Sequence, residues 1–268
     1  PAKENGSTTT PIKFVLPGVS ADASCDFYVV INRNIADNIT TKAKLLEELE
    51  SDIASYNGTY ANVTTKAMRS GGFAMTGTVT AKIVSGTTAV TVTVKRVVAK
   101  VEIQTSMTDS FRTKYGNGCV EVKKITLSRG AEKSYLIDQT ASKYATVSSS
   151  FTSAQDAYCD KTGASKTNAY KYNNLFYINE KAAAATGSRI KVVLDAIYDA
   201  DGNLSTTADQ VPLSYETELT GTTDGKMLRN GSYKLNVNLD GLTGKDMTLS
   251  IAIANWEALS TQNVNVGK

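Results

Sequence analysis

The chain offers few side chains that could carry out chemistry. It has no histidine among its 268 residues, which removes the Ser-His and Cys-His pairs of covalent hydrolases and the commonest metal ligand. The phosphate-binding patterns GxGxxG and GxxxxGK[ST] are absent. Carboxylates are plentiful, but no spacing singles out a pair suited to acid–base hydrolysis. We therefore expect no catalytic residue, no cofactor and no enzymatic activity.

Three cysteines, Cys25, Cys119 and Cys159, are widely spaced and form no CxxC pair. Their odd number allows at most one internal disulfide. A structural zinc site would need a histidine or a fourth cysteine. The favoured interpretation is three free thiols that are mostly buried as small apolar side chains.

The segment Asp199–Asn203, DADGN, hints at a calcium loop. The EF-hand pattern requires glycine at its sixth position and glutamate at its twelfth, where this chain has Leu204 and Gln210. A hairpin turn built on Asp-Gly explains the segment better, so we expect no metal site.

Four tyrosines gather in the second half of the chain: Tyr158, Tyr170, Tyr172 and Tyr177. If their rings were exposed together, they would form a platform for sugars. The alternative, which we favour, is that the rings pack at a domain junction while the hydroxyls reach water.

The charge balance does not point to a polyanionic partner. Lysine and arginine total 29 against 26 acidic residues, and no basic cluster stands out, so we expect no nucleic-acid binding. No apolar run approaches the roughly 18 residues of a spanning helix, so no membrane insertion is expected. The chain begins at Pro1 without a charged-then-apolar leader, which predicts either a cytosolic protein or one whose leader has been removed.

Strands must provide most of the framework. After the turn Asn230-Gly231, the side chains of Tyr233, Leu235, Val237 and Leu239 alternate with polar residues, which is typical of a half-buried strand. Similar segments are expected at 25–31, 73–84, 89–94, 97–103, 120–127, 134–137, 175–178, 190–198, 211–218 and 247–254. The length suits two β-domains, and the poorly periodic stretch 140–170 places their boundary near residue 145. The expected domains are therefore 1–145 and 146–268.

One amphipathic helix is predicted at about 41–56. Leu45, Leu49, Ile53 and Tyr56 recur every three or four residues and form one apolar stripe. We expect this helix to pack on a sheet or to bridge two strands.

The parity of the apolar residues changes at Lys95-Arg96, between the alternating runs 90–94 and 97–103. A one-residue slip moves every side chain to the opposite face, so a β-bulge or a strand that changes sheets is expected there. The runs 73–84 and 89–94 are expected to form a hairpin across Ser85-Gly86.

Several segments, in order, resemble the fimbrillins of Bacteroidales-type anaerobes, the subunits of type V pili. They are FAMTG at Phe73–Gly77, RVVAKVEI at Arg96–Ile103, LFYINE at Leu175–Glu180, LRNGSY at Leu228–Tyr233, and Trp256 near the end. They extend over most of the chain. Family members usually have Glu-Asn where this chain has Glu180-Lys181.

The resemblance implies two transthyretin-like β-sandwich domains, and so a mostly β fold. It also implies a surface lipoprotein precursor that is trimmed by an arginine-specific protease and polymerises by donor-strand exchange. The expected location is a fimbrium on the outer membrane, and the expected partners are copies of itself or related pilins, with host proteins or glycans as adhesion targets. A shaft subunit is favoured over a tip or anchor subunit. The alternative is a monomeric β-sandwich lipoprotein that binds glycans or host proteins.

The donor strand is expected within residues 259–268, with Leu259, Val264 and Val266 as its apolar residues. The alternative is that this tail forms the last strand of its own domain. Near the other end of the chain, Ile12, Phe14 and Leu16 belong either to a strand that is displaced in assembly or to a first strand that stays.

Overall fold

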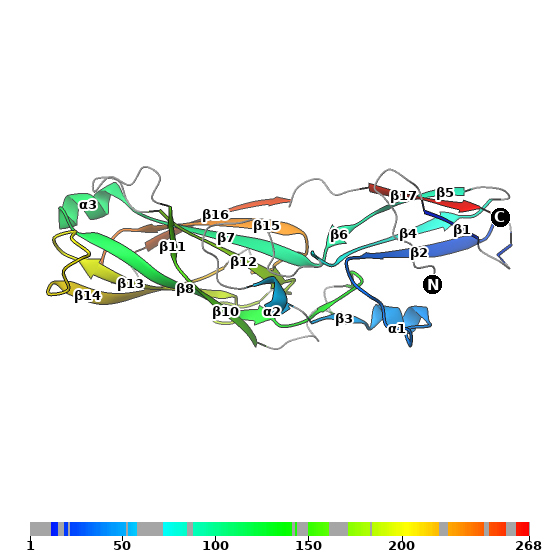
Figure 1. Cartoon of the computed structure of the whole chain (residues 1–268), viewed down its shortest axis with the longest axis horizontal. Coiled ribbons are helices and arrows are strands. Elements are labelled where there is room, and N and C mark those ends of the chain that lie inside the picture. The colour runs from blue at the N-terminus through cyan, green and yellow to red at the C-terminus, as the bar shows by residue number, and fades with distance from the viewer. Residues whose placement is uncertain are drawn as a thin grey trace.

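The fold was analysed in a computed structural model of the whole chain. It describes residues 12–15, 19–20, 22–51, 53–57, 72–84, 88–140, 143, 150–160, 171–182, 184–219, 225–243, 247–255 and 261–267. In the strands at 12–15, 158–160, 247–255 and 261–267 the description is limited to the backbone. The molecule is elongated, with strand-rich regions at both ends of its long axis (Figure 1).

The larger sandwich consists of two sheets from the middle and the second half of the chain. In the first sheet the strands follow the order β11 (Tyr158–Asp160), β12 (Lys171–Asn179), β7 (Val98–Met107), β15 (Gly231–Leu239) and β16 (Met247–Asn255). In the second sheet the order is β10 (Ser150–Asp156), β8 (Cys119–Ala131), β13 (Lys191–Asp199) and β14 (Gln210–Glu218).

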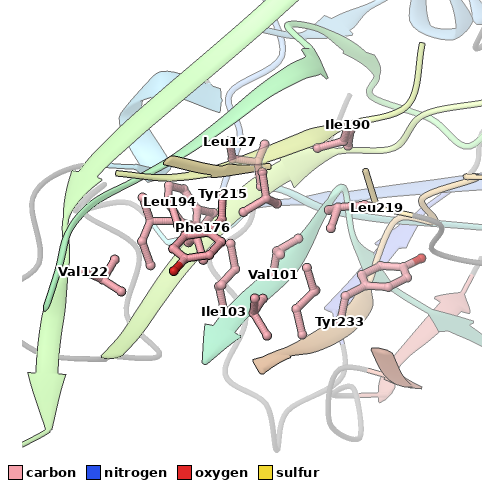
Figure 2. Close-up of a cluster of buried hydrophobic side chains, with 14 of the residues drawn as sticks. Val101, Ile103, Val122, Leu127, Phe176, Ile190, Leu194, Tyr215, Leu219 and Tyr233 are labelled. Atoms are coloured by element: carbon pink, nitrogen blue, oxygen red, sulfur yellow. The ribbon is translucent and has the colours of Figure 1, made fainter. Parts of the chain in front are cut away.

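Alternating apolar residues of the two sheets form one continuous core (Figure 2). Val101 and Ile103 of β7 lie in the same cluster as Leu127 of β8 and Leu194 of β13, and all four are fully buried. Burial of such a side chain contributes about 1.5–3 kcal/mol. The alternation predicted at Tyr233, Leu235, Val237 and Leu239 is confirmed, because all four residues are buried.

The smaller sandwich lies at the other end of the molecule (Figure 1). One sheet contains β2 (Ser24–Ile31), β4 (Met75–Lys82) and β6 (Lys95–Arg96), and the other contains β1 (Ile12–Val15), β17 (Thr261–Gly267) and β5 (Thr88–Thr93). Val90 and Val92 of β5 are buried against the partly buried Phe27, Val29 and Val79 of the opposite sheet.

A glycine allows β4 and β5 to approach closely. A Cβ atom on Gly77 would lie 2.2 Å from the backbone oxygen of Thr93 and 3.0 Å from Cγ1 of Val92. Contacts this short between a Cβ and a backbone atom are essentially excluded, so any larger residue at position 77 must separate the two strands.

The change of parity at Lys95-Arg96 marks the passage between the sandwiches, and the prediction of a strand that changes sheets is confirmed. β6 pairs with β4 of the smaller sandwich, whereas β7, which starts at Val98, pairs with β12 and β15 of the larger one. The sheets therefore group the strands differently from the expected division at residue 145. β7 and β8 pair with strands of the second half, and β17 pairs with β5 of the first.

The prediction of a single helix at 41–56 is wrong. The segment forms α1 (Lys42–Leu46), the short strand β3 (Leu49–Glu50) and α2 (Ile53–Tyr56). β3 pairs with β9 (Ser134–Tyr135), so long-range backbone pairing overrides the helical period. The apolar stripe is only partly used, since Ile53 and Tyr56 are buried while Leu45 is half-buried.

The expected hairpin of 73–84 and 89–94 is wrong as well. β4 pairs with β2 and β6, whereas β5 pairs with β17, so the two strands lie in different sheets. The stretch 140–170, expected to be a domain boundary or a long surface loop, contains β10 and β11. A helix that was not expected, α3 (Asp109–Tyr115), follows β7 and is capped by the hydroxyl of Thr108, which accepts from the Phe111 N–H.

No helix in the described part of the chain has both the length and the apolar character required to cross a membrane.

Candidate functional site

The C-terminal strand β17 occupies the middle of a three-stranded sheet in the smaller sandwich. It pairs antiparallel with β5 over six residues, from Thr261 opposite Thr93 to Val266 opposite Thr88. On its other side it pairs in parallel with the four residues of β1. Residues from both ends of the chain therefore share one sheet (Figure 1).

The register aligns the apolar residues of the three strands in rows. Val264 lies opposite Val90 of β5 and is paired with Ile12 of β1. Val266 lies opposite Thr88 and is paired with Phe14. Val90 is buried in the small core. The register row that contains position 264 is therefore the row whose β5 residue faces the opposite sheet.

The other two strands of this sheet depend on β17 for their pairing. Among the described residues, β5 and β1 each pair with no other strand. If β17 left, the six residues of β5 and the four residues of β1 would lose their ladder hydrogen bonds. Unpaired backbone groups at a sheet edge bind another extended segment readily.

These pairings bring together most of the residues predicted for strand exchange. Val264 and Val266 lie in β17, and Ile12 and Phe14 lie in β1, directly beside them. Leu259 and Leu16 lie outside the described residues. The tail forms a strand of the smaller sandwich and does not form the last strand of the larger one. Whether it acts as a donor, and whether β1 is displaced in assembly, stay predictions.

The sequence reasoning did not identify the segment that receives β17, namely β5 at Thr88–Thr93. A signal was present in the alternation of Val90, Val92 and Val94, all of which are buried. That pattern predicts a half-buried strand, but it contains nothing about which distant segment will pair with it.

Charges near this sandwich lie on its outer surface. The Lys42 ammonium and the Asp26 carboxylate form an exposed ion pair at 2.6 Å, and Asp26 also accepts a hydrogen bond from Thr80. The hydrogen bond and charge of Lys42 lower the pKa of Asp26. Lys82 pairs with Asp22 at 3.0 Å in the same way. Pairs this exposed contribute little to stability, so the pairing of β17 rests on the backbone ladder and on apolar residues.

Of the tyrosines and cysteines considered in the sequence, the structure describes the side chains of Tyr177, Cys25 and Cys119. Tyr177 is fully buried, with its ring centroid 4.8 Å from that of Phe73, so it cannot belong to an exposed platform. The remaining three tyrosines lie outside the described side chains. Cys25 and Cys119 are free thiols, as expected, and the side chain of Cys159 is outside the description.

Solved structures of bacterial proteins share this fold. A candidate cell adhesion protein from Bacteroides eggerthii aligns over 91% of this chain and 80% of its own, with 14% identity and a TM-score of 0.54. The tip fimbrial protein Mfa3 from Porphyromonas gingivalis, in a C-terminally truncated form, aligns over 86% of this chain and 80% of its own, with 15% identity and a TM-score of 0.51.

No family model and no curated protein matches the sequence. At 14–15% identity the structural likeness shows a common fold. The mostly β fold expected from the sequence is therefore confirmed, and it is the fold of solved adhesion and fimbrial proteins.

Proposed function

We propose that this chain is a structural subunit of a cell-surface fimbria that polymerises by exchanging its C-terminal strand. One observation carries the proposal: the middle strand of the β1–β17–β5 sheet comes from the far end of the chain. The resemblance of the sequence to fimbrillins and the fold shared with fimbrial proteins support the same reading.

The exchange is physically simple because the acceptor does not distinguish its own strand from that of a neighbour. The ladder hydrogen bonds and the Val264 row are the same whether β17 comes from the same chain or from the next one. Swapping identical elements is therefore a low-cost route to assembly. The free energies of the closed monomer and the open polymer therefore differ mainly in chain entropy, and the balance between the two forms depends on the protein concentration.

The connection between β16 and β17 permits this exchange. The sheet strand β16 ends at Asn255, and β17 starts at Thr261. The five residues 256–260 between them could extend over about 16 Å at about 3.3 Å per residue. The twelve residues after Trp256, which include β17, could extend over about 40 Å. Head-to-tail delivery of β17 does not close on itself, so the product is a filament.

A shaft subunit is the form of the proposal that we favour, because this chain offers both a donor strand and an acceptor. Each junction joins one donor to one acceptor, so a subunit at either end of the filament needs only one of these two features. In the same scheme, β1, which pairs only with β17 among the described strands, would pair with the incoming strand in the same way.

The proposal is tested by comparing the full chain with a variant that lacks residues 259–268. Both are incubated at high concentration under mildly destabilising conditions that release β17 from its sheet, and are then returned to native buffer. The full chain should give polymer ladders and filaments by electron microscopy, and the truncated chain should give neither.

The control is the full chain with Val211→Ser, which changes an exposed apolar residue of β14 at the opposite end of the molecule. This variant should polymerise like the unchanged chain. If the truncated chain forms the same ladders, β17 is not the donor. If the full chain stays monomeric throughout and binds a glycan or a host protein instead, the monomeric binder is the better description.

A further inference from the structure

A separate feature lies in the hairpin loop between β13 and β14, at the end of the molecule opposite to β17 (Figure 1). The loop is ten residues long, from Ala200 to Asp209, so it is not the two-residue turn that the sequence suggested. Three acidic residues converge here: Asp199, Asp201 and Asp209 each contribute a carboxylate oxygen, and these oxygens lie within 4.8 Å of one another.

One of these carboxylates is buried without full hydrogen bonding. Asp199 has 0% of its surface exposed. Its Oδ2 accepts a hydrogen bond from the Gln210 side chain at 3.1 Å, but its Oδ1 has no partner. A buried, unsatisfied carboxylate oxygen costs several kcal/mol unless a cation or a proton compensates it.

The described surroundings supply no counter-ion. Within the described residues, none of the three carboxylates forms an ion pair with a lysine or an arginine. Asp199 lies opposite the buried Cys119 in the pairing of β13 with β8.

The loop is held firmly in place next to this cluster. Gly202 has φ +74°, and a Cβ atom there would lie 2.4 Å from the backbone oxygen of Asn117, so the loop packs directly on the turn that precedes β8. The Asp201 N–H donates to Asp209 at 3.0 Å and the Asn203 N–H donates to Asp201 at 2.7 Å. The carboxylates are therefore preorganised by the backbone around them.

We propose that Asp199, Asp201 and Asp209 form a binding site for one calcium ion. This inference goes beyond the fimbrial role and does not depend on it. Three carboxylates are hard oxygen ligands, which favours Ca²⁺ or Mg²⁺ over softer metals. Oxygens bound to one Ca²⁺ can lie up to about 5 Å apart, because each Ca–O distance is about 2.3–2.6 Å, whereas on Mg²⁺ the limit is about 4.2 Å.

The three oxygens lie within 4.8 Å of one another, a span that one Ca²⁺ can bridge. Asp201 is exposed and Asp209 is half-buried, so water can reach the ion and complete its coordination. The ion would satisfy the free oxygen of Asp199 and join the two ends of the loop. Sites of this kind in extracellular modules bind Ca²⁺ with a Kd of about 10⁻⁴–10⁻³ M.

The test is calorimetric titration of the full chain with CaCl₂, together with thermal unfolding in EDTA and in about 10 mM Ca²⁺. This Ca²⁺ concentration is about tenfold or more above the expected Kd. The unchanged chain should bind one ion and show a higher Tm in Ca²⁺, with a smaller effect of Mg²⁺. Asp201→Asn should lower the affinity at least tenfold. The matched control is Asp195→Asn, an exposed aspartate of the same strand β13 outside the cluster, which should leave the affinity within twofold.

Asp199→Asn gives a second, independent readout. It removes the buried charge while keeping the shape, so it should raise the Tm in EDTA and abolish the further rise caused by Ca²⁺. If this variant does not fold, Asp201→Asn decides alone. The proposal is overturned if the unchanged chain shows neither heat nor a Tm shift with Ca²⁺, or if Asp201→Asn binds Ca²⁺ as tightly as the unchanged chain.

Discussion

The Nε of Arg229 donates a hydrogen bond to Oε2 of Glu180 at 2.9 Å, and both side chains are buried where the two sandwiches meet. A second contact joins Nη2 of Arg229 to Oε1 of Glu180. The same guanidinium donates to the backbone oxygens of Leu136 and Tyr135, at 3.1 and 2.7 Å. Arg229, just before β15, thus links Glu180, which follows β12, with Tyr135 of β9 and the adjacent Leu136.

This ion pair should be costly to break from one side. Arg229→Met leaves Glu180 charged and buried, so we expect the free energy of unfolding to fall by about 3–5 kcal/mol. The double variant Arg229→Met with Glu180→Leu should recover most of this loss, because no buried charge remains. Urea unfolding measures both. Lys82→Met, which breaks the exposed pair with Asp22, is the control and should change little.

An equal loss in the single and double variants would contradict this view of the junction. It would mean that the shape of the arginine, and not its charge, holds the two sandwiches together.

The close approach of β4 and β5 gives a second prediction. Gly77→Ala forces a Cβ against the backbone oxygen of Thr93, and overpacking of this kind typically costs about 1–3 kcal/mol. Gly130→Ala is the matched control, because its Cβ would meet Phe151 at an ordinary 3.5 Å. Urea unfolding of both variants checks the difference. Similar stabilities for the two would show that the sheets separate easily at β5.

Occupancy of the β17 position can be tested with a peptide. A chain that ends at Asn255 lacks β17, and hydrogen exchange at the β5 amides should therefore be much faster than in the full chain. Adding a peptide with the sequence of residues 259–268 should restore their protection. The same peptide with Val264→Asp should fail, because position 264 lies opposite the buried Val90 and a buried charge is expensive. Equal protection by both peptides would contradict the register.

The Cys119 thiol provides a prediction about pH. Its folded pKa is about 11, raised by burial from an ordinary 9.0. Because the raised pKa favours the neutral thiol in the folded chain, its contribution to stability is complete below pH 9 and is lost as the pH rises toward about 11. In EDTA, the free energy of unfolding should fall more steeply over this range in the unchanged chain than in Cys119→Ala. Identical slopes would show that the thiolate forms in the folded chain at no cost.

Local patterns predicted what depends on neighbours in sequence. The alternation from Tyr233 to Leu239 predicted a strand with one buried face, and the change of parity at Lys95-Arg96 predicted the passage from one sheet to another. The helix at 41–56 failed for the opposite reason. Leu49 fits a helical stripe, but its backbone pairs with Tyr135, and no pattern near Leu49 indicates that distant partner.

The candidate site likewise combines features that local patterns predict with features that depend on distant pairing. Val264 and Val266 were recognised as alternating apolar residues of a terminal strand, and Ile12 and Phe14 as a short strand at the other end. Their meeting beside β5 depends on pairing across most of the chain, which hydrophobic periodicity does not encode. The acidic loop was dismissed because it departs from the EF-hand spacing. Asp209 joins Asp199 and Asp201 through the closure of the hairpin, and not through a linear motif.

The most direct test of strand exchange uses two chains, each with one new cysteine, after the three native cysteines have been replaced by alanine. One chain carries Ala89→Cys on β5 and the other carries Asn265→Cys on β17, two positions that lie directly opposite each other. Cα atoms of such pairs are about 4.5–5.5 Å apart, a distance that a disulfide can bridge. Thr78→Cys, on the exposed face of β4, replaces Ala89→Cys as the control.

The two chains are mixed, taken through the polymerisation conditions and oxidised. Our account predicts a disulfide-linked dimer of the Ala89→Cys and Asn265→Cys chains on a non-reducing gel, and none with Thr78→Cys. If the dimer does not form, while a single chain that carries both Ala89→Cys and Asn265→Cys closes an internal disulfide, β17 stays in its own chain and the strand-exchange account is contradicted.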